Sequence, residues 1–212
     1  GDDDLKTFKK FYPKNKSKII KTGSPRVDLW KSTFFNYWGA PNKKPKKPYL
    51  LVSSNMGTSN GINSTSDVIK IFKDLGYLQR NSKLFNEYFE LIAEDSIKTS
   101  DFVEAIKHLA NENKEYDIVL RPHPIEDIEA WRLYLGNIPN VHVIREGSIT
   151  AWVNNAFAVM HNGCTTALEA SVIGKPVITY LPSNRKYMKN FPNKLGFRVN
   201  SLKQLSNKVN LL

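Results

Sequence analysis

Cysteine is nearly absent from this chain of 212 residues, and long hydrophobic runs are missing altogether. The single cysteine, Cys164, excludes an internal disulfide and fits a reducing compartment such as the cytoplasm. No apolar run approaches the roughly 20 residues that a membrane-spanning helix needs. The four histidines have no His or Cys partner at metal-ligand spacing. The nearest match to an Asp-x-Asp metal motif is residues 2–4, in a start that we expect to be disordered, so neither a metal nor another cofactor is expected.

Acidic residues are also few: 20 Asp and Glu stand against 31 Lys and Arg, and the formal net charge is +11. Such a balance favours anionic partners. Much of the excess lies in two Pro- and Lys-rich segments, 9–18 and 42–48, which have no helical or alternating pattern. Solvated linkers are the simplest interpretation, and a peripheral contact with the inner membrane surface is the alternative. Nucleic acid is not expected as a partner, because no helix-turn-helix, zinc or aromatic RNA-binding signature is present.

Short apolar segments alternate with amphipathic ones along the chain, which predicts an α/β fold. Strands are expected near 18–23, 48–55, 116–122, 141–146, 157–161 and 176–182, and helices near 24–30, 67–78, 82–113, 125–135, 149–156 and 164–174. The long stretch 82–113 is expected to break near 98–101, where Asp101 and Glu104 have the spacing of a capping box. This alternation predicts a Rossmann-like, doubly wound parallel sheet with right-handed crossovers and helices on both faces.

Polar, Gly and Pro residues follow four of the expected strands. They are Asn55, then Arg121 to Pro124, then Arg145, Glu146 and Gly147, and finally His161, Asn162 and Gly163. In sheets of this kind ligands bind beyond the carboxyl ends of the strands. The sequence therefore predicts a binding site at that edge of the sheet.

The run from His161 to Thr166 opens a helix with small and polar residues. Gly163 allows a sharp turn and close approach of a ligand, and the helix start offers free N–H groups for a phosphate. Thr165 and Thr166 add hydroxyl groups, and Glu169 lies about one turn further on, where it could accept hydrogen bonds from a ribose. Ordinary turn and cap chemistry is the alternative. Cys164 is not expected to be a nucleophile, because no triad spacing supports it.

Two further motifs have both a chemical and a structural interpretation. In the segment 121–124, two prolines fix the direction of His123 beside Arg121, which suits an anionic leaving group. A histidine that caps the next helix is the alternative. In the segment 23–28, Arg26 and Asp28 could form a surface ion pair of little energetic value.

Four motifs occur in a definite order: TGSPRVD at 22–28, SSNMGTSN at 53–60, RPHPIED at 121–127 and HNGCTTALEA at 161–170. This combination resembles the bacterial surface-carbohydrate biosynthesis proteins that include retaining β-Kdo glycosyltransferases. It is also distantly similar to capsule Kdo-transferases and bacterial polysialyltransferases. The resemblance extends from about residue 18 to residue 182.

The resemblance implies a GT-B fold, in which two Rossmann-like halves enclose the active site. Residues 1–47 would then be the end of the N-terminal half and a basic linker, and residues 48–212 the nucleotide-sugar-binding half. The implied function is transfer of a 2-keto sugar acid such as Kdo from a CMP-activated donor to a polysaccharide or glycolipid acceptor. A chain that holds mainly the donor half could lack activity by itself.

The resemblance also implies roles for single residues. Asp28 would be the catalytic nucleophile of a double displacement, and Arg26 and Asn55 would contact the sugar. The residues that would bind the donor nucleotide are Arg121, His123, Arg145, Glu146, Gly147, His161, Asn162, Gly163, Cys164, Thr165, Thr166 and Glu169. Among them the loop at 145–147 would meet the cytosine and Glu169 the ribose.

Two other functions stay open on the sequence. One is a GT-B transferase with another donor, such as a UDP-sugar or CDP-glycerol. The other is a non-catalytic nucleotide-binding module that recruits partners through its basic segments.

Overall fold

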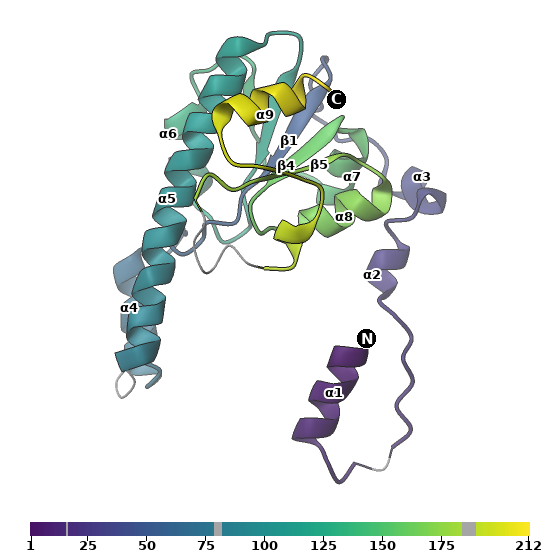
Figure 1. Cartoon of the computed structure of the whole chain (residues 1–212), viewed down its shortest axis with the longest axis vertical. Coiled ribbons are helices and arrows are strands. Elements are labelled where there is room, and N and C mark those ends of the chain that lie inside the picture. Colours follow the sequence, from purple (N-terminus) through teal and green to yellow (C-terminus); the bar gives the residue numbers. More distant parts are fainter. Residues whose placement is uncertain (16, 79–81, 184–189) are drawn as a thin grey trace.

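A six-stranded parallel sheet forms the centre of the computed structural model, which describes residues 1–15, 17–78, 82–183 and 190–212 (Figure 1). The strand order is β3-β2-β1-β4-β5-β6, and each neighbouring pair is parallel. The strands are β1 (Tyr49–Ser53), β2 (Asp117–Arg121), β3 (Val141–Val143), β4 (Ala158–His161), β5 (Val177–Tyr180) and β6 (Phe197–Val199). The order reverses between β1 and β4, and this reversal marks the switch point of a doubly wound sheet.

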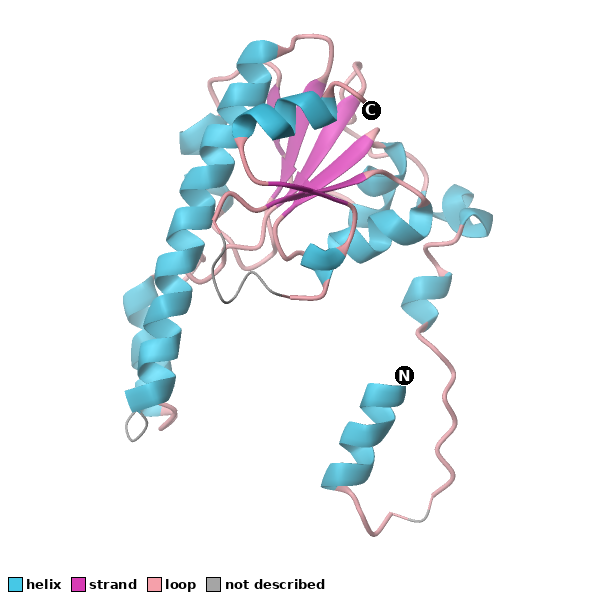
Figure 2. Cartoon of the chain, viewed as in Figure 1, coloured by secondary structure: helices cyan, strands magenta, loops and turns pink. Residues whose placement is uncertain are grey.

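Helices cover both faces of this sheet, as Figure 2 shows. They are α4 (Thr65–Asp74), α5 (Ser82–Glu112), α6 (Ile128–Leu135), α7 (Ile149–Asn155), α8 (Thr166–Ile173) and α9 (Leu202–Val209). Before β1 lie α1 (Asp2–Phe11), α2 (Pro25–Asp28), the 3-10 helix η1 (Ser32–Phe34) and α3 (Phe35–Trp38), and a second 3-10 helix, η3 (Pro192–Lys194), precedes β6. The predicted α/β class and doubly wound arrangement are therefore confirmed.

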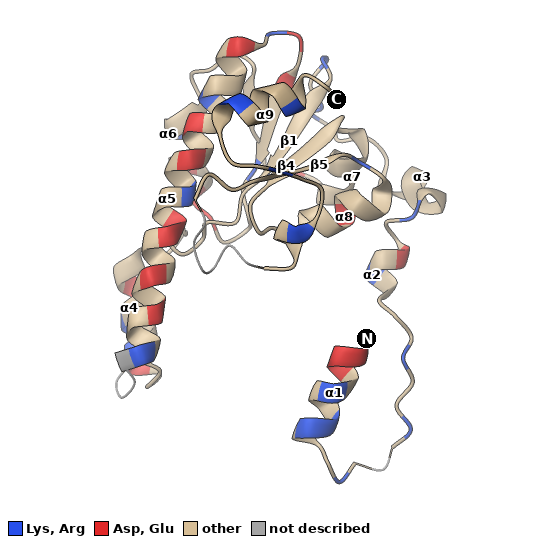
Figure 3. Cartoon of the chain, in the orientation of Figure 1, with Lys and Arg blue, Asp and Glu red and all other residues tan. Residues whose placement is uncertain are grey.

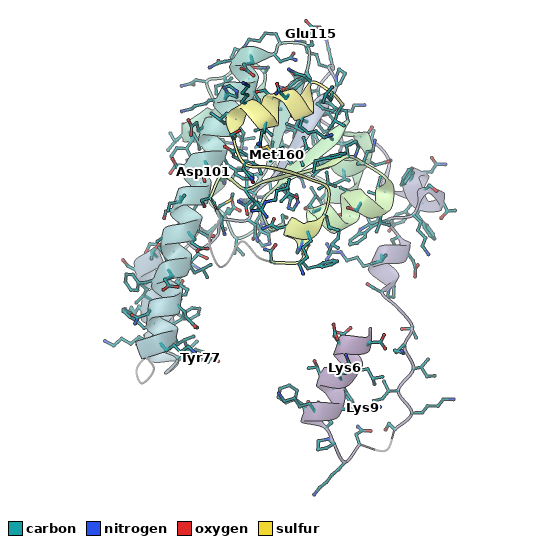
Figure 4. The ribbon with its side chains drawn as sticks, in the orientation of Figure 1. Lys6, Lys9, Tyr77, Asp101, Glu115 and Met160 are labelled. Carbon is teal, nitrogen blue, oxygen red and sulfur yellow. The ribbon has the colours of Figure 1, made fainter. Side chains whose placement is uncertain are left out.

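The core has one layer on each face of the sheet. Along β1 the buried side chains alternate, so that Leu50 and Val52 face one layer while Tyr49 and Leu51 face the other. The first layer packs against α5, α6 and α9, and the second against α7 and α8. A strand buried on both faces reads as a continuous apolar run, which is why the sequence identified β1 so clearly. Met160 of β4 lies within the sheet in Figure 4.

Three expectations about local structure are wrong. Residues 18–23 form no strand, because no described strand lies beside them and Ile20 is 68% exposed. Residues 2–4 begin the helix α1 instead of a disordered start. The helix α5 continues through 98–101, because Phe102 and the apolar residues after it pack on the sheet in the same helix. Asp101 Oδ2 has no hydrogen-bond partner in the described part of the chain, so it forms no cap there.

The sequence also did not predict the elements at the two ends of the chain. The elements β6 and α9 extend the sheet beyond the last expected strand. At the other end, α1 stands away from the sheet with Lys6 and Lys9 pointing outward, and none of its residues is buried (Figure 4). Its acidic start and basic end are visible in Figure 3. Within the described ranges, no helix has the length and apolar character needed to cross a bilayer.

Candidate nucleotide-binding site

A pocket of about 430 Å³ lies at the carboxyl edge of the sheet, next to the switch point between β1 and β4. The segments that follow β1, β2, β3 and β4 all contribute to it, as expected for parallel strands that end at one edge. Its lining residues are Arg26, Ser53, Ser54, Arg121, Pro122, His123, Pro124, Arg145, Gly147, Ile149, Cys164, Thr165 and Thr166. The structure thus brings together eight of the residues singled out in the sequence: Arg26, Arg121, His123, Arg145, Gly147, Cys164, Thr165 and Thr166.

The turn from β4 into α8 is built around Gly163. Its φ of +77° lies in the left-handed region, and a Cβ there would come within 2.5 Å of Asn190 Nδ2. Its backbone N–H donates to Asn193 Oδ1 at 2.6 Å. The positive φ therefore favours glycine here, and a larger residue would also have to displace the Asn190 side chain. The fixed turn directs the first residues of α8 toward the pocket.

The threonines at the start of α8 have different surroundings. Thr165 is the N-cap, yet its side chain makes no cap hydrogen bond, and it lies exposed at the pocket wall. The structural alternative, in which this side chain caps the helix, is therefore not what the structure shows. Thr166 is buried, and Ser53 Oγ lies 3.1 Å from its Oγ1 and 3.1 Å from Cys164 Sγ. These contacts hold the helix start against the end of β1.

Arg121 holds the loop after β3 in place. Its guanidinium donates to the carbonyl oxygens of Glu146 and, at 2.9 Å, Gly147, and it lies over the ring of Trp152. Burial lowers the pKa of Arg121 to about 10, so the group stays cationic at neutral pH. The side chain supplies positive charge to the pocket while it shapes the 145–147 loop.

His123 lines the pocket wall. The backbone N–H of Ile125 donates to His123 Nδ1 at 3.4 Å, which favours the neutral tautomer with its proton on Nε2. An Nε2–H group can donate to an anion. The helix α6 is capped by Asp127, whose side chain accepts from Glu129 N at 2.9 Å, so His123 does not serve as its cap.

Two more arginines, Arg145 and Arg26, bring charge to the pocket. Arg145 donates to the carbonyl oxygen of Glu126, and its Nε is buried without a hydrogen-bond partner in the described residues. Arg26 packs over the ring of Trp30. With Arg121, three of the described arginines line the pocket, and no described lining residue is acidic. This arrangement attracts a ligand with more than one negative charge.

Glu169 is buried beside the pocket rather than in its lining. Its side chain is 1% exposed, and burial raises its pKa against the opposing effects of the Thr150 hydroxyl and the Arg26 charge. One carboxylate oxygen, Oε1, has no hydrogen-bond partner among the described residues. A buried acceptor without a donor has a ready partner in a ligand hydroxyl.

Other residues singled out in the sequence lie outside the pocket lining, among them Asn55, Glu146, His161, Asn162 and Gly163. His161 Nε2 lies 2.9 Å from Thr179 Oγ1, and burial lowers the pKa of this histidine to about 4, so it is neutral. Both polar atoms of the Asn162 amide are buried, and no described residue forms a hydrogen bond with them. The Glu146 side chain is exposed and faces Lys43 at 3.5 Å.

Asp28 also lies outside the lining, with a side chain that is 56% exposed. It forms an ion pair with Lys31 at 2.6 Å, and not with Arg26 as the surface alternative expected. Its role as nucleophile therefore stays a prediction.

Sequence reasoning missed Ser53, Ser54 and Glu126. Ser53 ends β1 and Ser54 follows it directly, and the serine pair before Asn55 was the available signal. Glu126 is fully buried behind the pocket and is bonded to Ser54. No group of three or more metal-ligating side chains occurs in the part of the chain that the structure describes.

No family model matches this sequence, and no curated protein matches it. Solved structures match in fold. The UDP-GlcNAc 2-epimerase of Neisseria meningitidis, bound to UDP-GlcNAc, is 13% identical with a TM-score of 0.50, and the match covers 98% of this chain and 50% of that one. The UDP-GlcNAc 2-epimerase of Methanocaldococcus jannaschii, in complex with UDP-GlcNAc and UDP, is 16% identical with a TM-score of 0.46, over 99% and 45% of the two chains. The wall teichoic acid polymerase TagF, soaked with CDPG, is 12% identical with a TM-score of 0.46, over 96% and 43%.

This chain spans about half the length of those structures. The likeness concerns the fold. A six-stranded parallel sheet of order β3-β2-β1-β4-β5-β6 is the architecture of one Rossmann-like half of the GT-B-like enzymes. The chain therefore has the fold of a half-domain that is shared with nucleotide-sugar enzymes.

Proposed function

We propose that this domain binds the nucleotide of an activated sugar or polyol and is the donor-binding half of a transferase. The observation that supports the proposal is the pocket at the switch point, where three arginines and His123 surround the start of α8. A phosphate there would receive N–H groups from the helix start, a hydroxyl from Thr165 and the Nε2–H of His123. Phosphate charge would be neutralised without a divalent cation.

The nucleoside would lie between the loop after β3 and Glu169. The Arg145 and Gly147 loop would contact the base, and the unpartnered oxygen of Glu169 would accept a ribose hydroxyl. Asp28 is our proposal for the nucleophile, with a partner acid from an acceptor-binding half. Residues 48–212, which hold all six strands, would form the donor half.

Two classes of donor fit this pocket. UDP-sugars and CDP-glycerol carry a diphosphate, and a CMP-activated sugar acid carries one phosphate and one carboxylate, so charge alone does not separate them. We place the UDP- or CDP-activated donor first, because the Neisseria epimerase of the same fold holds UDP-GlcNAc. The CMP-activated 2-keto sugar acid, which the motif resemblance implies, is the second candidate.

Calorimetric titration of the chain with UDP, CDP and CMP tests both the site and the donor. If UDP or CDP binds at least about tenfold more tightly than CMP, a difference of roughly 1.4 kcal/mol, the result supports a diphosphate donor. If CMP binds more tightly by that factor, the result supports the CMP-activated sugar acid. Affinity should not change when EDTA is added, because the described residues form no metal site. A chain that binds none of the three nucleotides would contradict the proposal.

The variant Thr165→Val tests the position of the phosphate. Loss of one hydroxyl hydrogen bond to a charged group should weaken nucleotide binding by roughly 1.5–3 kcal/mol. Thr7→Val, at an exposed threonine of α1, is the matched control and should bind as the parent does. Equal affinity of both variants would mean that the phosphate lies elsewhere in the pocket.

A further inference from the structure

The carboxylate of Glu126 is 0% exposed and accepts hydrogen bonds from three groups. Its Oε1 accepts from the backbone N–H of Met56 at 2.9 Å. Its Oε2 accepts from Ser54 Oγ at 2.8 Å and from Trp131 Nε1 at 2.6 Å. The side chain therefore ties the segment after β1 to the helix α6.

The backbone of Glu126 joins two more segments to the same point. Its N–H donates to the carbonyl oxygen of His123 at 2.9 Å, in the segment after β2. Its carbonyl oxygen accepts from the guanidinium of Arg145, which follows β3. Ser54, His123 and Arg145 all line the pocket. One buried residue thus contacts three of the strand-end segments that form the site.

The surroundings of the side chain require two acceptor oxygens. Every neighbour that bonds to it through an N–H group is a donor only, and Met56 N–H and Trp131 Nε1–H approach different oxygens. An amide of the same shape would turn its NH₂ group toward one of these two donors. A carboxyl group, with an acceptor oxygen on each side, satisfies both donors, and the amide of the same shape does not.

We infer that Glu126 is a positioning residue of the nucleotide site, which fixes Ser54, His123 and Arg145 relative to one another. The inference rests on the proposed function of the pocket. Glu126 itself does not line the pocket, so it acts through these three residues and not by contact with the ligand.

The variant Glu126→Gln in the whole chain tests this role, with UDP, CDP and CMP as calorimetric probes. The NH₂ group of the glutamine would face another N–H donor, either that of Met56 or that of Trp131. This repulsion should displace the segment after β1 or β2 and weaken binding of the best nucleotide by about tenfold or more. Trp131→Phe is the control: it removes one bond to the same carboxylate, but Trp131 lies outside the pocket lining. That variant should melt at a lower temperature and keep its affinity within about twofold.

The double variant Glu126→Gln with Trp131→Phe distinguishes an effect of side-chain geometry from an effect of the Glu126 charge. It also tests the inference if the single Gln variant does not fold. Without the indole N–H, the amide can donate to Ser54 Oγ and accept from Met56 N, so the geometry returns without the charge. Recovery of affinity to within a few-fold of the parent would support positioning. Recovery of the melting temperature without recovery of affinity would overturn it.

Other outcomes are also decisive. A folded Glu126→Gln variant that binds as tightly as the parent would overturn this inference and leave the proposed function standing. A parent chain that binds no nucleotide would overturn the proposed function, and this inference with it.

Discussion

Gly163 has a left-handed backbone conformation and also lies close to the Asn190 side chain. Gly163→Ala would place a Cβ at a φ of +77° and 2.5 Å from Asn190 Nδ2, so we expect a loss of about 1–3 kcal/mol of unfolding free energy and weaker nucleotide binding. Gly174→Ala is the matched control, since its φ is +87° but nothing lies within 4 Å of its Cβ position. Denaturant unfolding of both variants isolates the contact with Asn190. A smaller loss in Gly163→Ala than in Gly174→Ala would contradict this account.

Glu169 gives a prediction for pH dependence. Burial raises its pKa in the folded chain, so the folded state holds this proton more tightly than the unfolded state does. The contribution of Glu169 to the unfolding free energy is therefore greatest below the ordinary Glu pKa and is lost as pH rises through the raised value. As pH rises through this range, the unfolding free energy of Glu169→Gln should increase relative to that of the parent, as measured by urea unfolding at several pH values. If the difference between the two unfolding free energies stays constant with pH, the pKa of Glu169 is not raised in the folded chain.

Asp95 of the helix α5 forms a buried ion pair within the helix and also accepts a hydrogen bond from the loop after β1. Lys98 Nζ lies 2.9 Å from Asp95 Oδ1, both side chains are buried, and Asp95 Oδ2 accepts from Thr58 N at 3.2 Å. Asp95→Ala would leave the ammonium group buried without this partner, and we expect a loss of about 3–5 kcal/mol in urea unfolding.

The pair of Arg132 and Glu129 on α6 provides the control, because it has the same i,i+3 spacing but both side chains are largely exposed. Glu129→Ala should cost at most about 1 kcal/mol. Similar losses in the two variants would mean that burial does not strengthen the pair on α5.

At the scale of the whole molecule, α1 and the described residues between it and α2 stand apart from the sheet (Figure 1). No residue of α1 is buried, and the ion pair of Lys21 with Asp2 stays within the segment. A chain of residues 23–212 should therefore unfold within about 1 kcal/mol of the parent and bind nucleotide equally well.

Removal of residues 1–47 should behave differently. It takes away Arg26 from the pocket and the buried Trp30, and also α3, which packs against α7. We expect both a lower melting temperature and weaker nucleotide binding, measured by thermal unfolding and calorimetry. Equal behaviour of the two shortened chains would show that Arg26 and α3 contribute nothing to the site.

The sequence predicted some strands correctly and others not. The strands β1, β2, β4 and β5 were predicted because they are short apolar runs bounded by turn residues. The short edge strand β6 was missed, since FRV has no such pattern and only two of its three residues are apolar. Residues 18–23 had the pattern of a strand but no neighbour to pair with, and pairing is a property of the fold.

The sequence by itself determined the class of fold and the edge at which polar residues gather, because strand period and turn chemistry are local. Only the tertiary structure decided which of those residues share a pocket: Arg145 and Thr165 line it, while His161 bonds with Thr179 beneath the sheet edge. The fold likewise revealed Glu126, since its partners Ser54 and Met56 lie about 70 residues earlier in the chain. Contacts at such separations depend on how the strands are ordered in the sheet, and that order comes from long-range packing.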